Sequence, residues 1–357
     1  MAQFALPRLV PILPGITAGL LSLGLWQVGA WQALERVGYN SLFSFRQTLN
    51  RPRWDSRIVV IAIDKASLKQ YGGFPWTRDS YTKLLRSLEV APPAVIGLDI
   101  IFAESTSQDS SLAEAIAGIG NVVLATGADE EGQAIPIVPS LINVAPQGHV
   151  YNRSDSDGIS RQAVLYFNQF PSFGIAALQV YQETIRTTIK AKVDRSASQA
   201  ISLPPPTPGL PEQTAWINWI DTTQTIPTYS LKDVVQGKIP TQAFADKIVL
   251  VGATSTGLDP LHTPLNHTPP TSGVYLHAAV IDNLLNHRFL QSLPNHIVLP
   301  LLMLLGLGTN LILLHQKARG RVVLLAMLVL IWFSVAVACL LSDSTGCQLQ
   351  HRSERCS

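Results

Sequence analysis

The side chains best placed to do chemistry are carboxylates that follow strongly apolar stretches. Asp64 ends the apolar run at residues 58–63, Asp99 lies near the end of the run at 94–102, and Glu104 follows closely. In an open α/β sheet, ligands bind in the crevice beyond the carboxyl ends of the strands. Carboxylates at that edge would bind a cation, an amine or a sugar hydroxyl. The alternative is that each aspartate caps the turn or helix that follows its strand.

A glycine-rich turn and two histidines lie together further along the chain. The turn GATSTG at residues 252–257 follows another apolar run, and its backbone N–H groups around Thr254 could receive an anion. It lacks a P-loop lysine and the spacing of a dinucleotide fingerprint, so nucleotide binding is not expected and a tight turn is the alternative. Asp259, His262 and His277 offer a donor set that zinc accepts. The two histidines are not at helical ligand spacing, so we predict no metal and no cofactor. His262 and His277 are only weak metal candidates, and the alternative is that each has a structural role.

Three other patterns are weighed against plainer roles. Residues 155–158, DSDG, open like a calcium loop, but the twelfth position is Tyr166 rather than an acidic residue, so a hairpin turn is predicted. Trp76 and Arg78 stand beside Pro75 and would either form part of a pocket wall or pack in the core. No nucleophile motif of the Gly-x-Ser-x-Gly type is present. The sequence therefore predicts no enzyme activity.

These residues are positioned by apolar strands that alternate with helices. Strands that are apolar on both faces and separated by helices imply a parallel sheet covered on both sides. We therefore predict an α/β fold with a mostly parallel, doubly wound sheet. The strands are expected at 57–64, 94–102, 121–126 and 247–254, and the helices at 79–90 (with Asp79 as N-cap), 109–119 and 274–286.

The middle of the chain is less regular. Segments 148–151 and 163–167 are short strand candidates, predicted to pair antiparallel across the turn at 155–158 as an inserted hairpin. The proline-rich segment PPPTPG (204–209) can form neither a helix nor a central strand, because proline lacks the backbone N–H that both need. The other expected elements are a helix over 34–53, a helix over 173–189, a surface loop at 204–209 and a strand over 216–220.

Long apolar runs flank this domain. Leu9 to Ala30, Ile297 to Leu314 and Val322 to Leu341 are nearly free of charge, and roughly 20 residues suffice to cross a bilayer as a helix. The short loop 315–321 between the last two runs carries three Lys or Arg residues, which favours the cytoplasmic side. The predicted order is a transmembrane anchor (1–30), a large extracytoplasmic domain (31–296), a transmembrane helix (297–314), a cytoplasmic loop (315–321), a transmembrane helix (322–341) and a polar tail (342–357) that reads as truncated. A cleaved signal peptide is the alternative for the first run.

The composition limits which classes of partner the protein can bind. A net charge of +2 provides no basic face for nucleic acid. Cys339, Cys347 and Cys356 all lie near the C-terminus, so the large domain must be stable without disulfides. Gly15 and Gly19 have the spacing of a close helix contact, which indicates a homodimer through the membrane helices or a chance occurrence of a common residue.

In six segments the chain resembles the type-two CHASE domain, an extracellular sensory module of bacterial adenylate cyclases, histidine kinases and Ser/Thr kinases. The similar segments span roughly residues 35 to 290 in the family's order. They are IVVIAIDKASL (58–68), GGFPWTRDSY (72–81), AVIGLDIIFAE (94–104), GHVYNRSDSDGISRQ (148–162), KIVLVGATSTGLDPLHTP (247–264) and GVYLHAAVIDNLL (273–285).

The resemblance implies a periplasm-facing sensor joined by membrane helices to a cytoplasmic effector, with an undefined ligand. This chain departs from the pattern because a polar tail follows residue 341, so kinase or cyclase activity is not carried over. We expect a sensor in the bacterial cytoplasmic membrane that binds an unknown small ligand and lacks its effector. The alternatives are a periplasmic α/β enzyme, such as a metal-assisted hydrolase using Asp64 and Asp99, and a non-signalling remnant of a truncated receptor.

Overall fold

The computed structural model describes residues 32–49, 52–127, 135–192, 201–221, 226–266 and 269–291, and the single positions 17, 20, 21 and 24. The chain divides into two compact units, Arg51–Leu290 and, separately, Met1–Asn50 with Gln291–Ser357. The apolar runs at 297–314 and 322–341, the loop between them, the cysteines and the polar tail lie outside the described residues, as does nearly all of the run at 9–30. Among the described residues, no helix combines the length and the apolar character that crossing a membrane requires.

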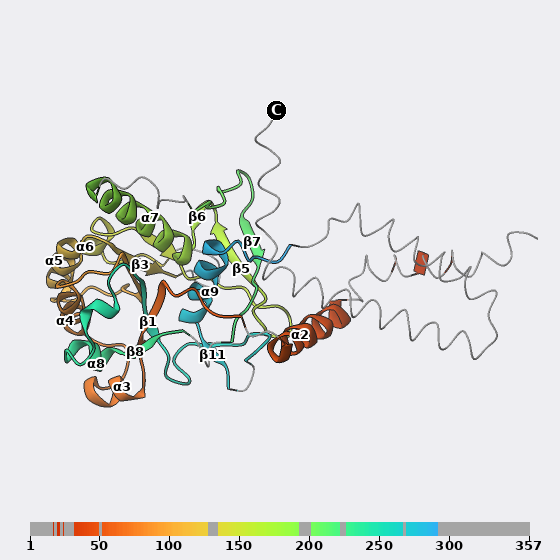
Figure 1. Ribbon diagram of the computed structural model, residues 1–357, viewed down its shortest axis with the longest axis horizontal. Helices are drawn as coiled ribbons and strands as arrows, with labels where there is room; N and C mark the ends of the chain where they lie inside the picture. Colours follow the sequence, from red (N-terminus) through yellow and green to blue (C-terminus); the bar gives the residue numbers. More distant parts are fainter. Residues whose placement is uncertain are drawn as a thin grey trace, which may run out of the picture. The chain divides into compact units, whose positions relative to one another are not determined.

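The unit Arg51–Leu290 is built on a six-stranded parallel sheet, which confirms the predicted α/β class (Figure 1). The strand order is β4-β3-β2-β9-β1-β8, and every neighbouring pair in this sheet is parallel. The neighbouring strands β1 and β9 are buried along their whole length. The strands are β1 (Ile58–Ile63), β2 (Val95–Ile101), β3 (Val122–Thr126), β4 (Gln147–His149), β8 (Thr228–Ser230) and β9 (Ile248–Ala253).

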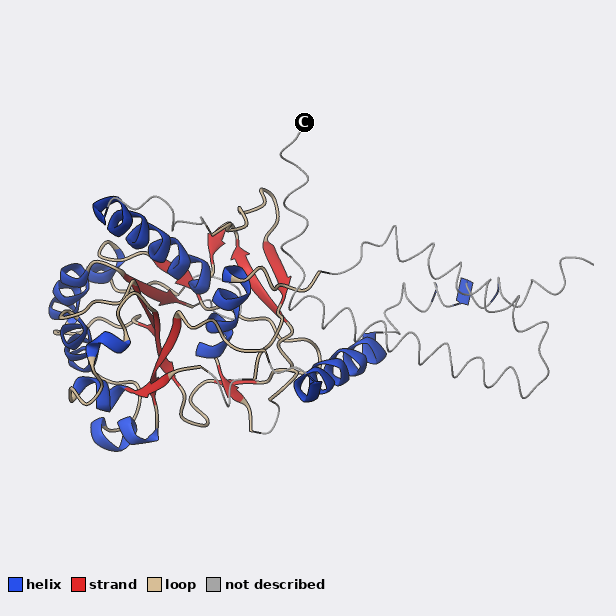
Figure 2. Cartoon of the chain, in the orientation of Figure 1, coloured by secondary structure: helices blue, strands red, loops and turns tan. Residues whose placement is uncertain are grey.

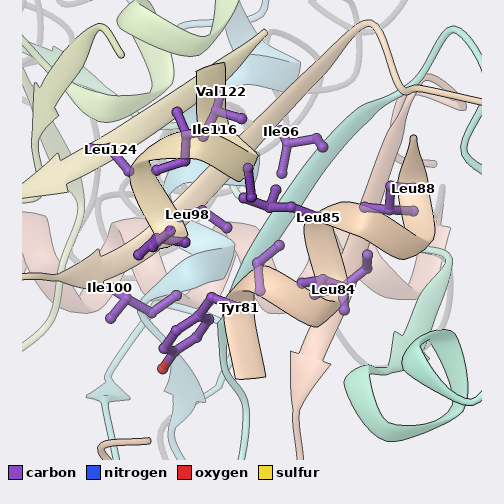
Figure 3. Packing of buried hydrophobic residues seen from close by; sticks show 14 of the residues in the cluster. Tyr81, Leu84, Leu85, Leu88, Ile96, Leu98, Ile100, Ile116, Val122 and Leu124 are labelled. Atoms are coloured by element: carbon purple, nitrogen blue, oxygen red, sulfur yellow. The ribbon is translucent and has the colours of Figure 1, made fainter. Parts of the chain in front are cut away.

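Helices cover both faces of the sheet, as a doubly wound fold requires (Figure 2). On one face, the apolar sides of α4 and α5 meet Ile96, Leu98 and Leu124 of the strands (Figure 3). The opposite face is covered by α7 and α9, which also contact each other. The helices are α3 (Lys65–Tyr71), α4 (Arg78–Leu88), α5 (Asp109–Ile119), α6 (Pro139–Ile142), α7 (Phe173–Lys192), α8 (Leu231–Val235), the short 3₁₀ helix η1 (Thr241–Ala243) and α9 (Val274–Leu285).

The predicted hairpin between 148–151 and 163–167 is wrong. β4 instead joins the main sheet beside β3, whereas β5 (Gln162–Phe167) lies in a separate antiparallel sheet of order β6-β5-β7. The reason is a tighter local turn: Asn168 and Gln169 both have positive φ, the geometry of a two-residue hairpin, and they bring β6 (Phe170–Pro171) back onto β5. The DSDG turn itself forms, but within the loop between β4 and β5.

Two further expectations need correction at their boundaries. The strand expected over 216–220 is β7 (Glu212–Trp216), because the next backbone N–H groups are used elsewhere: Asn218 N donates to the Asn283 side chain at 2.9 Å. The N-cap of α4 is Thr77, and Asp79 lies in the first turn, where it pairs with Lys83.

The remaining elements follow the predictions closely. The helices expected over 109–119, 173–189 and 274–286 are α5, α7 and α9, and the proline-rich segment 204–209 is a loop. The helix expected over 34–53 is α2 (Gln32–Leu49), which belongs to the other compact unit. The small strands β10 (Pro260–Leu261) and β11 (Thr271–Ser272) pair with each other just before α9.

Candidate functional site

Asp99 stands on β2, on the face of the sheet that α7 and α9 cover. Alternate residues of a strand face opposite sides, and Ile96, Leu98 and Ile100 belong to the core under α4 and α5 (Figure 3). Asp99 therefore faces the other way, and a Cβ built on Gly252 of the neighbouring strand β9 would lie 3.2 Å from its Oδ2. The side chain is only 11% exposed. Within the described residues its carboxylate accepts no hydrogen bond, so it caps neither a turn nor a helix.

His277, in the first turn of α9, is a polar neighbour of that carboxylate. Its Nε2 lies 3.7 Å from Asp99 Oδ1, which is within ion-pair range but too long for a hydrogen bond. The ring of His277 is buried and meets the ring of Phe173 in an edge contact at 5.0 Å between centroids. The imidazole is thus held beside Asp99 by packing, with its nitrogen close to the carboxylate but not bonded to it.

Asp259 adds a second carboxylate at the start of α9. A Cβ on Gly273, the residue that precedes α9, would lie 2.0 Å from Asp259 Oδ2, so only glycine allows the carboxylate to rest there. The backbone N–H of Gly273 donates to the Asp259 carbonyl at 3.1 Å. Asp259 as a whole residue is exposed, but neighbouring atoms partly desolvate its carboxylate; this desolvation, and then the negative charge of Asp99, raise the pKa of Asp259, while His277 acts in the opposite direction. Asp99, Asp259 and His277 form one electrostatic group, the Asp99 cluster.

Asp64 has the role that the capping alternative describes. Its Oδ1 accepts from the backbone N–H of Ser67 at 2.8 Å, which makes it the N-cap of α3, and from the Ser230 hydroxyl at 2.9 Å. Burial works to raise the pKa of Asp64, but these hydrogen bonds outweigh it and the pKa is lowered. The two aspartates are also not on neighbouring strands, because β9 lies between β1 and β2.

Trp76, Arg78 and Glu104 lie apart from the Asp99 cluster. Trp76 belongs to the core on the opposite face of the sheet, and its Nε1 donates to the Gly72 carbonyl at 2.9 Å. The buried guanidinium of Arg78 pairs with Asp109 at 2.9 Å and also donates to the carbonyl of Glu104. Its polar atoms thus hold the loop after β2 onto the start of α4. A role of these three residues in ligand binding stays a prediction.

The other predicted sites are occupied by local structure. The N–H groups of Thr254 and Ser255 both donate to the Ile63 carbonyl, so they are used within the turn after β9. His262 is exposed and its carbonyl accepts from Ser160, whereas His277 is buried. Within the described residues, no group of three or more His, Cys, Asp or Glu side chains is arranged to hold a metal ion.

The acidic residues of the DSDG turn bind an arginine. Arg161, 1% exposed, pairs with Asp155 and with Asp157. These ion pairs engage the two carboxylates that a calcium loop would contribute first. The turn therefore binds the buried Arg161 guanidinium of the same chain rather than a calcium ion.

A buried polar group that sequence reasoning did not identify lies at the far end of α9. Asp282, with no exposed surface, accepts from the Asp55 backbone N–H at 2.9 Å, from Asn286 at 3.3 Å and from Arg288 at 3.2 Å. Arg288 also donates to the Arg53 carbonyl at 3.1 Å. These residues join the segment before β1 to the segment after α9, so the two ends of the unit Arg51–Leu290 are tied together. Only their positions near the ends of the predicted domain could have indicated this.

Comparison with known proteins identifies one family. A family model described as "CHASE2 domain" matches residues 17–314. No curated protein matches the chain, and neither does any solved structure.

Proposed function

The chain belongs to the CHASE2 domain family, a family of extracellular sensory domains, and on that premise we propose that it binds a small ligand outside the cytoplasm at the Asp99 cluster. The unit Arg51–Leu290 would be the sensing part. The apolar runs at 9–30, 297–314 and 322–341 would anchor it in the bacterial cytoplasmic membrane, with the basic loop 315–321 inside.

The single observation that carries the ligand site is the Asp99 carboxylate. A carboxylate that is 11% exposed normally has hydrogen-bond partners, because burying an unpaired charge is costly. Asp64 and Asp109 follow that rule, whereas within the described part of the chain the Asp99 carboxylate has no partner but His277, at 3.7 Å. Two carboxylates and an imidazole together accept hydrogen bonds, so the ligand class is one that donates them: an amine or a polyhydroxylated molecule such as a sugar.

Helix α9 supports a sensory role because it connects the two polar groups. His277 lies in its first turns, and Asp282 and Asn286 lie at its other end, bonded to the segments where the chain enters and leaves the unit. A ligand that binds one position of α9 better than another would shift the equilibrium between them. That shift would reach both ends of the unit at once.

The test is a thermal-unfolding screen of the purified full-length chain with primary amines, diamines and sugars. At least one compound should raise the unfolding midpoint of the wild type, and Asp99→Asn should abolish that shift while the midpoint without ligand stays within a few degrees. Asp79→Asn is the matched control, since that carboxylate is exposed and pairs only with Lys83. A panel without any shift, or a shift that Asp99→Asn retains, would exclude the site.

The orientation is tested separately. Protease added to intact spheroplasts should digest the unit Arg51–Leu290. Full protection of that unit, with a cytosolic marker equally protected, would place the domain on the wrong side of the membrane for this proposal.

A further inference from the structure

Two buried polar side chains beside the start of α7 have no hydrogen-bond partner in the described part of the chain. Ser172 directly precedes α7, and His149 is the last residue of β4; each is 4% exposed. Within the described residues, Ser172 Oγ and both ring nitrogens of His149 have no partner. The great majority of buried polar atoms in proteins are paired. Three unpaired atoms on two adjoining residues therefore point to something that binds there.

Backbone packing brings these two residues together. His149 and Ser172 form a parallel β-bridge. The approach depends on Gly148, where an added Cβ would lie 2.5 Å from the Phe173 Cα. Strand β4 thus lies directly against the first residue of α7, and the backbones of His149 and Ser172 lie side by side at the N-terminal end of this long helix.

The chemistry of this end of α7 favours negative charge. The first N–H groups of a helix have no partner within the helix, and the aligned peptide dipoles place partial positive charge there. A serine before a helix usually turns its oxygen onto one of those N–H groups. Ser172 does not, so its hydroxyl proton is available to another acceptor. Helix N-termini of this kind bind anions when further donors are at hand.

His149 supplies a second neutral donor. Burial, and then the charge of His277, lower the pKa of His149 to about 4, so the ring is neutral near pH 7 and carries one N–H. Among the described residues, His277 is the titratable group that acts on this ring, and no carboxylate does. The rings of Phe167 and Phe170 flank the imidazole at 6.3 and 6.5 Å between centroids.

We propose that Ser172, His149 and the N-terminus of α7 bind a small monovalent anion, either a halide or a carboxylate of the size of formate. The anion would accept hydrogen bonds from the Ser172 hydroxyl and the His149 N–H. Its size is limited because both side chains are almost fully buried and two aromatic rings flank the imidazole. This site is separate from the proposed ligand site, whose two carboxylates would repel an anion.

The experiment compares thermal unfolding of the full-length chain in sodium gluconate, chloride, formate and benzoate at equal ionic strength. Chloride or formate at tenfold its Kd should raise the midpoint by about 3–6 °C relative to gluconate, and benzoate should not. Ser172→Ala should remove the difference between salts. His149→Gln is a second variant, and it should weaken the difference.

The matched control is Ser230→Ala. Ser230 also directly precedes a helix, but its hydroxyl is bonded to Asp64, so its loss should lower the midpoint equally in every salt and keep the chloride effect. Equal wild-type midpoints in all salts would show that a bridging water alone serves these atoms. That result, or a chloride effect unchanged in Ser172→Ala, would overturn the anion site and leave the Asp99 proposal untouched.

Discussion

Replacing Asp282 with asparagine should change how the stability of the protein depends on pH. Asp282 is fully buried at the C-terminal end of α9, and burial raises its pKa to about 6. Arg288 acts to lower that pKa, but it does not offset burial. The buried carboxylate therefore holds a proton more tightly in the folded chain than in the unfolded chain, where its pKa is near the ordinary value of 3.8.

The size and direction of the effect follow from this difference. When the folded pKa of an acid is raised, stability increases as the pH falls through the folded pKa toward the unfolded one, because protonation favours the folded state. A difference of roughly two pKa units corresponds to about 3 kcal/mol in total. Between pH 8 and pH 5 the expected gain is about 1.4 kcal/mol.

His149 works against Asp282 in the same pH range. Its pKa is lowered to about 4, first by burial and then by the charge of His277, from an ordinary value of 6.5. The unfolded chain takes up a proton on this histidine at a higher pH than the folded chain does. The stability that the neutral, buried ring contributes is therefore lost as the pH falls from 6.5 toward 4. The two effects are opposite in sign and offset each other in part, so the wild-type curve alone would not separate them.

The assay is therefore a difference measurement. Urea unfolding of the full-length chain in detergent, followed by tryptophan fluorescence, would be recorded at pH 8, 7, 6 and 5 for wild type and Asp282→Asn. The stability of the wild type relative to the variant should rise by about 1.4 kcal/mol from pH 8 to pH 5, because groups common to both cancel. Asp79→Asn, an exposed control, should give a constant difference. A constant difference for Asp282→Asn as well would refute the reasoning.

Two further substitutions test the packing around the sites. Gly148→Ala should destabilise the chain by about 2 kcal/mol or more, because the added methyl group would overlap the Phe173 backbone. Gly73→Ala is the control, since Gly73 has open space around it and its substitution should not destabilise the chain in this way. The midpoints of urea unfolding of the two variants are compared with that of the wild type. Arg161→Met should cost about 3 kcal/mol by the same assay, since it breaks two ion pairs of a buried guanidinium, while Arg153→Met, which removes an exposed pair with Glu212, should cost less than about 1 kcal/mol. An equal cost for the two arginines would contradict the role of burial.

Local patterns were sufficient to predict the longer helices and four of the six parallel strands; β4 was assigned to a hairpin and β8 was not predicted. The apolar runs that become β1, β2, β3 and β9 are buried almost throughout, and the apolar spacing within α4 matches the side it presents to the core. The inserted hairpin could not be predicted in this way. It depended on the choice between a loop turn at 155–158 and the tighter turn at Asn168 and Gln169. Asn168 is a residue that favours positive φ, but Gln169 is not, so the second turn lacks the usual glycine signal.

The candidate site could be predicted in part, and the missing part is topological. Asp64 ends one apolar run and Asp99 lies near the end of another, so the sequence predicted both carboxylates at the carboxyl edge of the sheet. The chain instead inserts β9, from residues 248–253, between β1 and β2. This non-local pairing sets Gly252 beside Asp99 and carries the start of α9, with His277, over the same face.

That insertion also explains why the two aspartates differ. Asp64 leaves its strand directly into α3 and finds the N–H of Ser67, a partner that its own local sequence supplies. Asp99 is still within β2, so no following turn can satisfy it, and its neighbours come from β9 and α9, far along the chain. A carboxylate whose surroundings are built entirely by distant segments is sensitive to how those segments are placed. Under the ligand-binding proposal, Asp99 is the residue through which a bound molecule would alter the position of α9.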